Sequence, residues 1–192
     1  MAHAAVAHAA EGQVVLAGVQ QAMARLKLPE AATATVQDDA SDAQTSAQKL
    51  ADADPEAVIV GLAGKPALQF VKAFRPLRRG VNVYALSVMG TSASIKALGA
   101  DATGMAVSQA MPLPTKSIAL VVREFQQAWK AAGASAEPSH LALEGYINAR
   151  VFAEALQRAG SNPTRASFTH ATWELKRLDL GGFEINASVP ER

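Results

Sequence analysis

The sequence predicts an α/β protein built on an open parallel sheet of about five strands, followed by additional C-terminal helices. One observation is the short apolar run Ala57–Val60, which is rich in β-branched residues and typical of a strand buried on both faces of a parallel sheet. Such runs alternate with helical patterns as far as residue 107, which predicts parallel strands with helices on both faces. The alternation stops near Pro114, after which helical patterns dominate.

The first part of the chain is expected to consist of five strand–helix units. Strands are expected at residues 4–7, 31–36, 57–60, 81–86 and 104–107. Helices are expected at 13–26, from 42 to about 51, from Pro66 onward, and at 92–98 before Gly99. The apolar side of the first helix would carry Val15, Leu16, Val19, Met23 and Leu26, and that of the third Leu68, Val71 and Leu77.

The second part is expected to be mainly helical. One helix is expected at 117–132, with an apolar stripe of Ile118, Val121, Val122, Phe125 and Trp129. Another is expected after Ser139, with a stripe of Leu143, Ile147, Val151, Phe152 and Leu156. A shorter helix is expected after Asn162-Pro163, and a strand near 183–186 after the turn at Gly181-Gly182.

Composition excludes several classes of function. Eighteen basic against seventeen acidic residues give a net charge of +1, too little to draw the chain to nucleic acid or an anionic membrane. The absence of cysteine excludes disulfides, thiolate metal sites and a cysteine nucleophile. No apolar run approaches the ~20 residues that cross a bilayer. Residues 1–12 lack the basic and apolar regions of a signal peptide, so a mature, truncated or cytosolic form is expected.

None of the short motifs supports catalysis, a metal or a cofactor. Gly61-x-x-Gly64-Lys65 lacks the glycine spacing and the following Ser or Thr of a phosphate loop. Ser87 lies between Leu86 and Val88 rather than within the glycine pattern of a nucleophile elbow. The four histidines show no i, i+4 metal spacing. These motifs therefore indicate no enzyme, and a small α/β enzyme is the least favoured of the three functions considered.

Several stretches together resemble one known family in order and spacing. They are AVIVGLAGKPALQFVKAFRPL, VNVYALSVMGTSASIKALGADATGMAVSQAMPLP, IALVVREFQQAWKAAG and LALEGYINARVFAEALQRAG. The most specific pieces are Leu143–Tyr146, Ala149-Arg150 and Asp179–Phe183. The chain thus resembles the type I periplasmic solute-binding proteins of ABC transporters, of the branched-chain amino-acid (leucine/isoleucine/valine-binding) kind.

The resemblance implies a protein of two Rossmann-like α/β lobes that traps a small solute as the lobes close. Residues 1–113 would form the second lobe, and residues 114–192 the crossover helices of an incomplete first lobe and a returning strand. The N-terminal first-lobe segment of the family is absent from this chain. The resemblance also implies a periplasmic location, an ABC transporter permease as partner, and no enzymatic activity.

The resemblance places the ligand at the loops that follow the strands. The cleft-side positions would be His8, Glu11, Leu62, Gly64, Ser87, Met89 and Gln109. Amino-acid binders of the family use a glutamate for the ligand ammonium at about the position of Met89, and aromatic residues at Gly64 and at Glu11 or Ala10.

Because these partners are missing, the ligand is expected not to be a standard amino acid, since a buried unpaired ammonium costs several kcal/mol. The alternative is a non-binding remnant or fragment that is stabilised by self-association, and a homodimer or swapped assembly is expected in either case.

Overall fold

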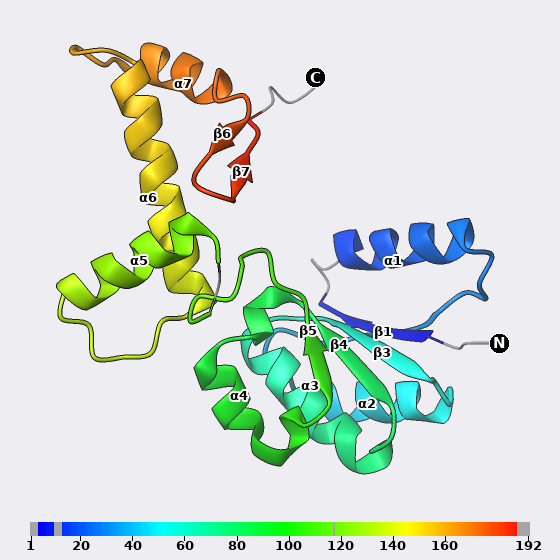
Figure 1. The fold of residues 1–192 in the computed structure, drawn as a ribbon. Coiled ribbons are helices and arrows are strands. Elements are labelled where there is room, and N and C mark those ends of the chain that lie inside the picture. Colours follow the sequence, from blue (N-terminus) through cyan, green and yellow to red (C-terminus); the bar gives the residue numbers. More distant parts are fainter. Residues whose placement is uncertain (1–3, 10–12, 117, 188–192) are drawn as a thin grey trace. The chain divides into compact units, whose positions relative to one another are not determined.

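The computed structural model describes residues 4–9, 13–116 and 118–187, and the chain divides into two compact units, residues 1–110 and 111–192. The first unit contains a five-stranded parallel sheet (Figure 1). Its strands are β1 (Ala4–His8), β2 (Ala32–Thr35), β3 (Ala57–Gly61), β4 (Asn82–Ala85) and β5 (Met105–Val107). Their order in the sheet is β2-β1-β3-β4-β5, with every neighbouring pair parallel. The predicted fold class is confirmed.

Helices cover both faces of this sheet. The helix α1 (Gln13–Arg25) lies on one face, while α2 (Ala43–Asp52), α3 (Gly64–Leu77) and α4 (Ser92–Leu98) lie on the other (Figure 1). Two short 3-10 helices, η1 (Ser87–Met89) and η2 (Gly99–Ala102), flank α4. This division follows from right-handed crossovers, because the step from β1 to β2 runs in the opposite direction to the later steps.

The main core lies between the sheet and the helices α2 and α3. Val58 and Val60 of β3 and Val83 of β4 are at most 1% exposed and belong to the same apolar cluster as the α3 side chains. The rings of Phe70 and Phe74 stack with centroids 5.7 Å apart in this cluster. A smaller cluster around Val6 and Met23 connects the other face to α1.

Arg75 is a buried cation that joins α3 to the two segments that enter β4 and β5. Its side chain is only 7% exposed and donates hydrogen bonds to the backbone carbonyls of Asp101 (3.1 Å), Val81 (3.0 Å) and Thr103 (2.9 Å). These carbonyls lie in the segments that enter β4 and β5. Arg75 therefore fixes where both strands begin.

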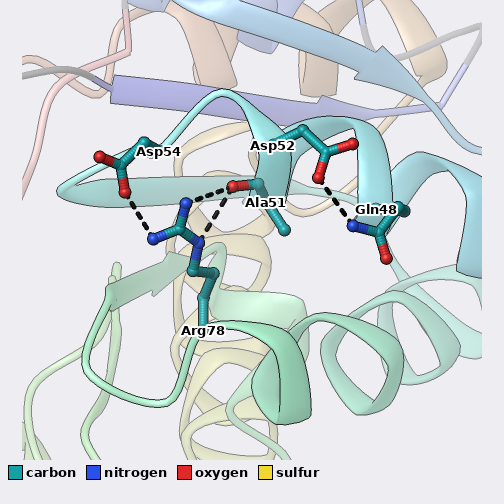
Figure 2. A network of polar contacts seen from close by, with 5 residues as sticks. All are labelled: Gln48, Ala51, Asp52, Asp54 and Arg78. Carbon is teal, nitrogen blue, oxygen red and sulfur yellow. Dashed lines mark hydrogen bonds and ion pairs between the residues drawn. The ribbon is translucent and has the colours of Figure 1, made fainter.

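Arg78 closes the end of α2 in a similar way. Its Nε and Nη2 both donate to the carbonyl of Ala51, at 3.0 and 2.7 Å, and its Nη1 forms an ion pair with Asp54 (Figure 2). A cation at a helix C-terminus is favourable because it satisfies a carbonyl that lacks an intrahelical partner. Nearby, the Gln48 amide donates to Asp52 at 2.7 Å within the helix (Figure 2).

The second unit combines three helices and a two-stranded antiparallel ribbon. They are α5 (Leu120–Ala131), α6 (His140–Arg158), α7 (Arg165–Trp173), β6 (Leu178–Asp179) and β7 (Glu184–Ile185). Val121, Phe125 and Ile147 belong to the core between α5 and α6. Arg150 of α6 pairs with Glu124 of α5, and hydrogen bonding to Glu124 raises the pKa of the guanidinium further above its usual value. No helix in the described part of the chain is long and apolar enough to cross a membrane.

The structure corrects several sequence expectations at the ends of helices. The helix α3 begins at Gly64 rather than Pro66, α5 begins at Leu120 rather than near residue 117, and the strand β6 was not expected. Five residues assigned to buried apolar stripes are exposed instead: Leu26 (64%), Leu77 (37%), Ile118 (97%), Phe152 (56%) and Leu156 (38%). Leu26 and Ile118 lie beyond the ends of α1 and α5, and Leu77 is the last residue of α3. Phe152 and Leu156 do not belong to the cluster between α5 and α6.

Replacing Arg75 by methionine is expected to lower the free energy of unfolding by about 2–4 kcal/mol, because three backbone carbonyls lose the donor that the buried guanidinium supplies. Urea denaturation would measure the change. Arg79→Met, at an exposed position on the same connection, is the matched control and should change stability by less than about 0.5 kcal/mol. Equal effects of the two substitutions would contradict this role for Arg75.

Candidate functional site

The carboxyl ends of the parallel strands meet at one edge of the sheet, here called the carboxyl edge. The strand register pairs His8 of β1 with Gly61 of β3, and Ala85 of β4 with both Val60 and Val107. The loops that follow β1, β3, β4 and β5 therefore leave the sheet side by side. In open α/β sheets, this edge is where ligands bind.

Gln109 and the turn after β4 form the most defined part of this edge. A Cβ at Gly90 would collide with Nε2 of Gln109, so the Gln109 amide lies directly over the bare backbone of Gly90. The carbonyl of Ser87 and the side chain of Val107 border the same place. Ser87 and Gln109 are both exposed, so a hydroxyl and an amide are available to solvent here.

His8 contributes an imidazole at the end of β1. The residue is 7% exposed, and its Nδ1 lies 2.8 Å from the carbonyl of Ala9. Because a carbonyl oxygen only accepts, this contact places a proton on Nδ1, which in a neutral ring leaves Nε2 as an acceptor. The His8 carbonyl is already used by the amide of Val36, at 2.9 Å.

Gly64 shapes the loop after β3 through its backbone. Its φ of +57° lies in the left-handed region, which disfavours residues with a Cβ, although a Cβ there would meet no atom within 4 Å. An aromatic residue at this position would therefore have space but would strain the backbone. The expected aromatic residue is thus absent from a loop whose conformation suits glycine.

Two of the seven predicted site residues belong to the core. Leu62 is 2% exposed and Met89 is fully buried, and both lie in the cluster beneath the sheet. Their side chains present no surface to a solute in this structure. His8, Gly64, Ser87 and Gln109 remain at the carboxyl edge, and Glu11 falls outside the described residues.

A polar loop after β2 extends the same edge. Asp39 accepts a hydrogen bond from the amide of Ser41 at 2.9 Å, and this bond is the main reason that the pKa of Asp39 lies below its usual value. The positive charge of Lys65 in α3 lowers the same pKa further. The sequence alone does not reveal that Lys65 is close to Asp39, because the two residues approach only through the tertiary fold.

Two hollows in the first unit lie away from the predicted site residues. One of about 350 Å³ is lined by Gln20, Met23, Ala24, Leu28, Glu30 and Ala31, where α1 ends and β2 begins. Another of about 260 Å³ lies between α2 and α3. The hollow of about 350 Å³ lies at the amino end of β2, at the edge of the sheet opposite the carboxyl edge. Among the described residues, no group of His, Asp or Glu could hold a metal ion.

The fold is that of a Rossmann-like α/β lobe with the loops of its strands gathered at the carboxyl edge. The sequence pattern of the periplasmic binding protein family matches residues 1–188. The chain belongs to this family, which confirms the resemblance inferred from the sequence. Members of the family bind solutes outside the cytoplasm, work with ABC transporter permeases and are not enzymes.

Solved structures agree with this assignment. A substrate-binding periplasmic protein from Ralstonia solanacearum is 34% identical, with a TM-score of 0.84, and the match covers 96% of this chain and 54% of that one. An extracellular ligand-binding receptor from Verminephrobacter eiseniae is 25% identical (TM-score 0.82; 98% and 56% covered).

A possible leucine/isoleucine/valine-binding protein from Rhodopirellula baltica SH 1 is 22% identical (TM-score 0.88; 97% and 52% covered) and supports the fold alone. The chain thus spans about half the length of the solved structures that it matches. None of the curated proteins compared with it matches.

Met89→Glu tests whether a family-type glutamate is compatible with this turn. We expect a loss of about 3 kcal/mol or more in the free energy of unfolding, because the carboxylate would enter the core without a partner. The exposed neighbour provides the control: Val88→Glu, at 52% exposure, should change stability by less than about 0.5 kcal/mol. Urea denaturation of both variants would decide, and a well-tolerated Met89→Glu would mean that the turn opens readily.

Proposed function

We propose that this chain is the solute-binding component of an ABC-type uptake system, and that its ligand is a small molecule without an ammonium group. Residues 1–113 would correspond to the second lobe of the family. Residues 114–192 would supply crossover helices of the first lobe and a returning strand. The proposed ligand-binding positions remain His8, Glu11, Gly64, Ser87 and Gln109, with Leu62 and Met89 as the packing beneath them.

The observation that carries this proposal is that the described loop residues after β1, β3, β4 and β5 are polar but not acidic, whereas Asp39 and Asp42 lie in the loop after β2 and accept backbone amides there. The described loop residues 9, 62–63, 86–91 and 108–110 include the hydroxyls of Ser87, Thr91 and Ser108, the Gln109 amide and no acidic side chain. An ammonium group enclosed there would lose its hydration without gaining a carboxylate, at a cost of several kcal/mol. A hydroxyl, carbonyl or carboxylate can instead accept from the Gln109 amide and the Ser87 hydroxyl.

Family membership supports the wider setting of the proposal. We infer a periplasmic location and an ABC transporter permease as the partner of the ligand-loaded protein. No catalytic role is proposed, because the described loop residues 9, 62–63, 86–91 and 108–110 include no acidic side chain that could act with a base.

The second candidate is a form that binds no solute and is stabilised by self-association. Exposed apolar side chains in the second unit favour it, since Ile118 is 97% and Leu141 is 69% exposed. Apolar surface of this kind often marks a protein–protein contact. A chain that self-associates could also bind a solute, so self-association and solute binding need separate measurements.

The ammonium argument can be tested with matched ligand pairs. Thermal-shift screening followed by calorimetry would compare each aliphatic amino acid with its 2-hydroxy and 2-oxo analogue, for example leucine with 2-hydroxy-4-methylpentanoate. We expect stabilisation to be confined to the analogues that lack the ammonium group. Micromolar binding of leucine would contradict the proposed ligand class, and no binding by any compound would favour the second candidate.

Once a ligand is found, Gln109→Ala and Gly90→Ala should each lower the binding affinity by roughly 10- to 100-fold. Gln109→Ala removes the side-chain amide, and the Cβ of Gly90→Ala would displace that amide. The double variant should be little worse than either single one, since both act on the same group. Gln127→Ala and Gly18→Ala are matched controls at exposed positions elsewhere, and a Cβ at Gly18 would meet no atom within 4 Å. Calorimetry would measure the affinities, and additive losses would argue against this arrangement.

A further inference from the structure

The first turn of α1 lies directly on the sheet at Gly61, the last residue of β3. A Cβ placed on Gly61 would lie only 2.8 Å from Cγ1 and 3.1 Å from Cβ of Val15 in α1. The shorter of these distances is a steric clash, so a side chain at this position would displace the helix. Glycine in a strand often marks such a close approach of another element. The absence of a side chain at Gly61 therefore allows α1 to lie this close to the end of β3.

This contact lies beside His8. The strand register places His8 of β1 directly opposite Gly61, and neighbouring strands are about 4.8 Å apart. Val6 belongs to the apolar cluster that includes α1, whereas Ala7 belongs to the cluster on the other face of the sheet. Because side chains alternate between the two faces of a strand, His8 lies on the same face as Val6. The imidazole and the first turn of α1 therefore share one face of the sheet at the carboxyl edge.

The rest of α1 limits how the helix can respond to a side chain at Gly61. Met23, close to the other end of α1, is 7% exposed and packs in the cluster with Val6. Val15 is β-branched, and such a residue in a helix has one strongly preferred χ1, so its Cγ1 cannot turn away at low cost. A Cβ at Gly61 would therefore displace the first turn of α1 while Met23 holds the last turns in place.

A displacement of this turn would be passed on to the end of β1. Only residues 10–12 separate Ala9 from Gln13, the first residue of α1, and one of them is Glu11. The Nδ1 proton of His8 is donated to the carbonyl of Ala9 at 2.8 Å. The place of the imidazole thus depends on Ala9, and the place of Ala9 depends on where α1 begins.

We propose that Gly61 is a positioning residue of the solute site. Its missing side chain places the first turn of α1 at the carboxyl edge, and this turn in turn fixes the place of His8 and of the loop after β1. Gly61 has no side chain with which to bind a solute, so it acts only through these neighbours. The link to solute binding rests on the proposed function, but the effect on His8 can be measured without a solute.

Nuclear magnetic resonance of the His8 ring tests this role in the solute-free protein. The chain has four histidines, and the ring signals of His8 are those that disappear in His8→Gln. Gly61→Ala should shift these signals. Gly18→Ala, in the same helix, is the matched control and should leave them unchanged, because a Cβ there would meet no atom within 4 Å. Unchanged His8 signals in Gly61→Ala would overturn the proposal.

A second substitution separates positioning from a general loss of stability. Val15→Ala removes Cγ1, the atom nearest to the new side chain, and leaves only the contact with Cβ at 3.1 Å. The double variant Gly61→Ala/Val15→Ala should therefore fold and give nearly the same His8 signals as Val15→Ala alone, even if Gly61→Ala alone fails to fold. His8 signals in the double variant that differ from those of Val15→Ala as much as Gly61→Ala differs from wild type would overturn the proposal.

Calorimetry with 2-hydroxy-4-methylpentanoate connects the positioning role to binding. Gly61→Ala should lower the affinity about tenfold, and the double variant should recover most of the loss. An unchanged affinity in Gly61→Ala would overturn the role of Gly61 at the site. If the wild-type chain binds neither this compound nor the other ammonium-free analogues, that result contradicts the proposed function, and the His8 spectra still decide whether Gly61 positions the loop.

Discussion

The parallel pairing of β1, β3 and β4 is the constraint on which the rest of the first unit depends. Parallel neighbours cannot be joined by a tight turn, so each pair requires a helical crossover, and the crossovers cover both faces of the sheet. The same pairing brings the loops after four strands to one edge. The parallel register therefore has two consequences. It places the core between the sheet and the helices α2 and α3, and it gathers the polar loops at the strand ends.

That register also separates the predicted site residues into two sets. Leu62 and Met89 lie directly after β3 and near the end of η1, where their side chains turn into the apolar cluster. Ser87 and Gln109, from neighbouring loops, remain exposed. A carboxylate in place of Met89 would have to remain unpaired in the core or open the turn. The missing glutamate is therefore linked to the packing of this turn, as well as to the identity of the ligand.

The second unit illustrates how a helix can satisfy its own unit and still keep an apolar face. The contact between α5 and α6 is completed by Leu143, Ile147 and the Glu124–Arg150 pair, and it uses only one side of α6. On another side of α6, the ring of Phe152 packs against that of Phe168 in α7, with centroids 5.0 Å apart, and yet the residue is 56% exposed. Leu141 and Leu156 are also exposed, and apolar surface of this kind often marks a contact with another element.

The sequence by itself determined the fold class, the family and most helices and strands. Apolar runs and periodicity reflect local burial, and a family pattern such as Leu143–Tyr146 can be recognised from the order of its residues alone. The tertiary structure decided which apolar residues are buried, as Phe152 and Leu156 show. It also decided which loop residues are open at the carboxyl edge, and that Gln109 lies over Gly90. These features depend on contacts between segments that are distant in the chain, and such contacts leave no periodic signal in either segment alone.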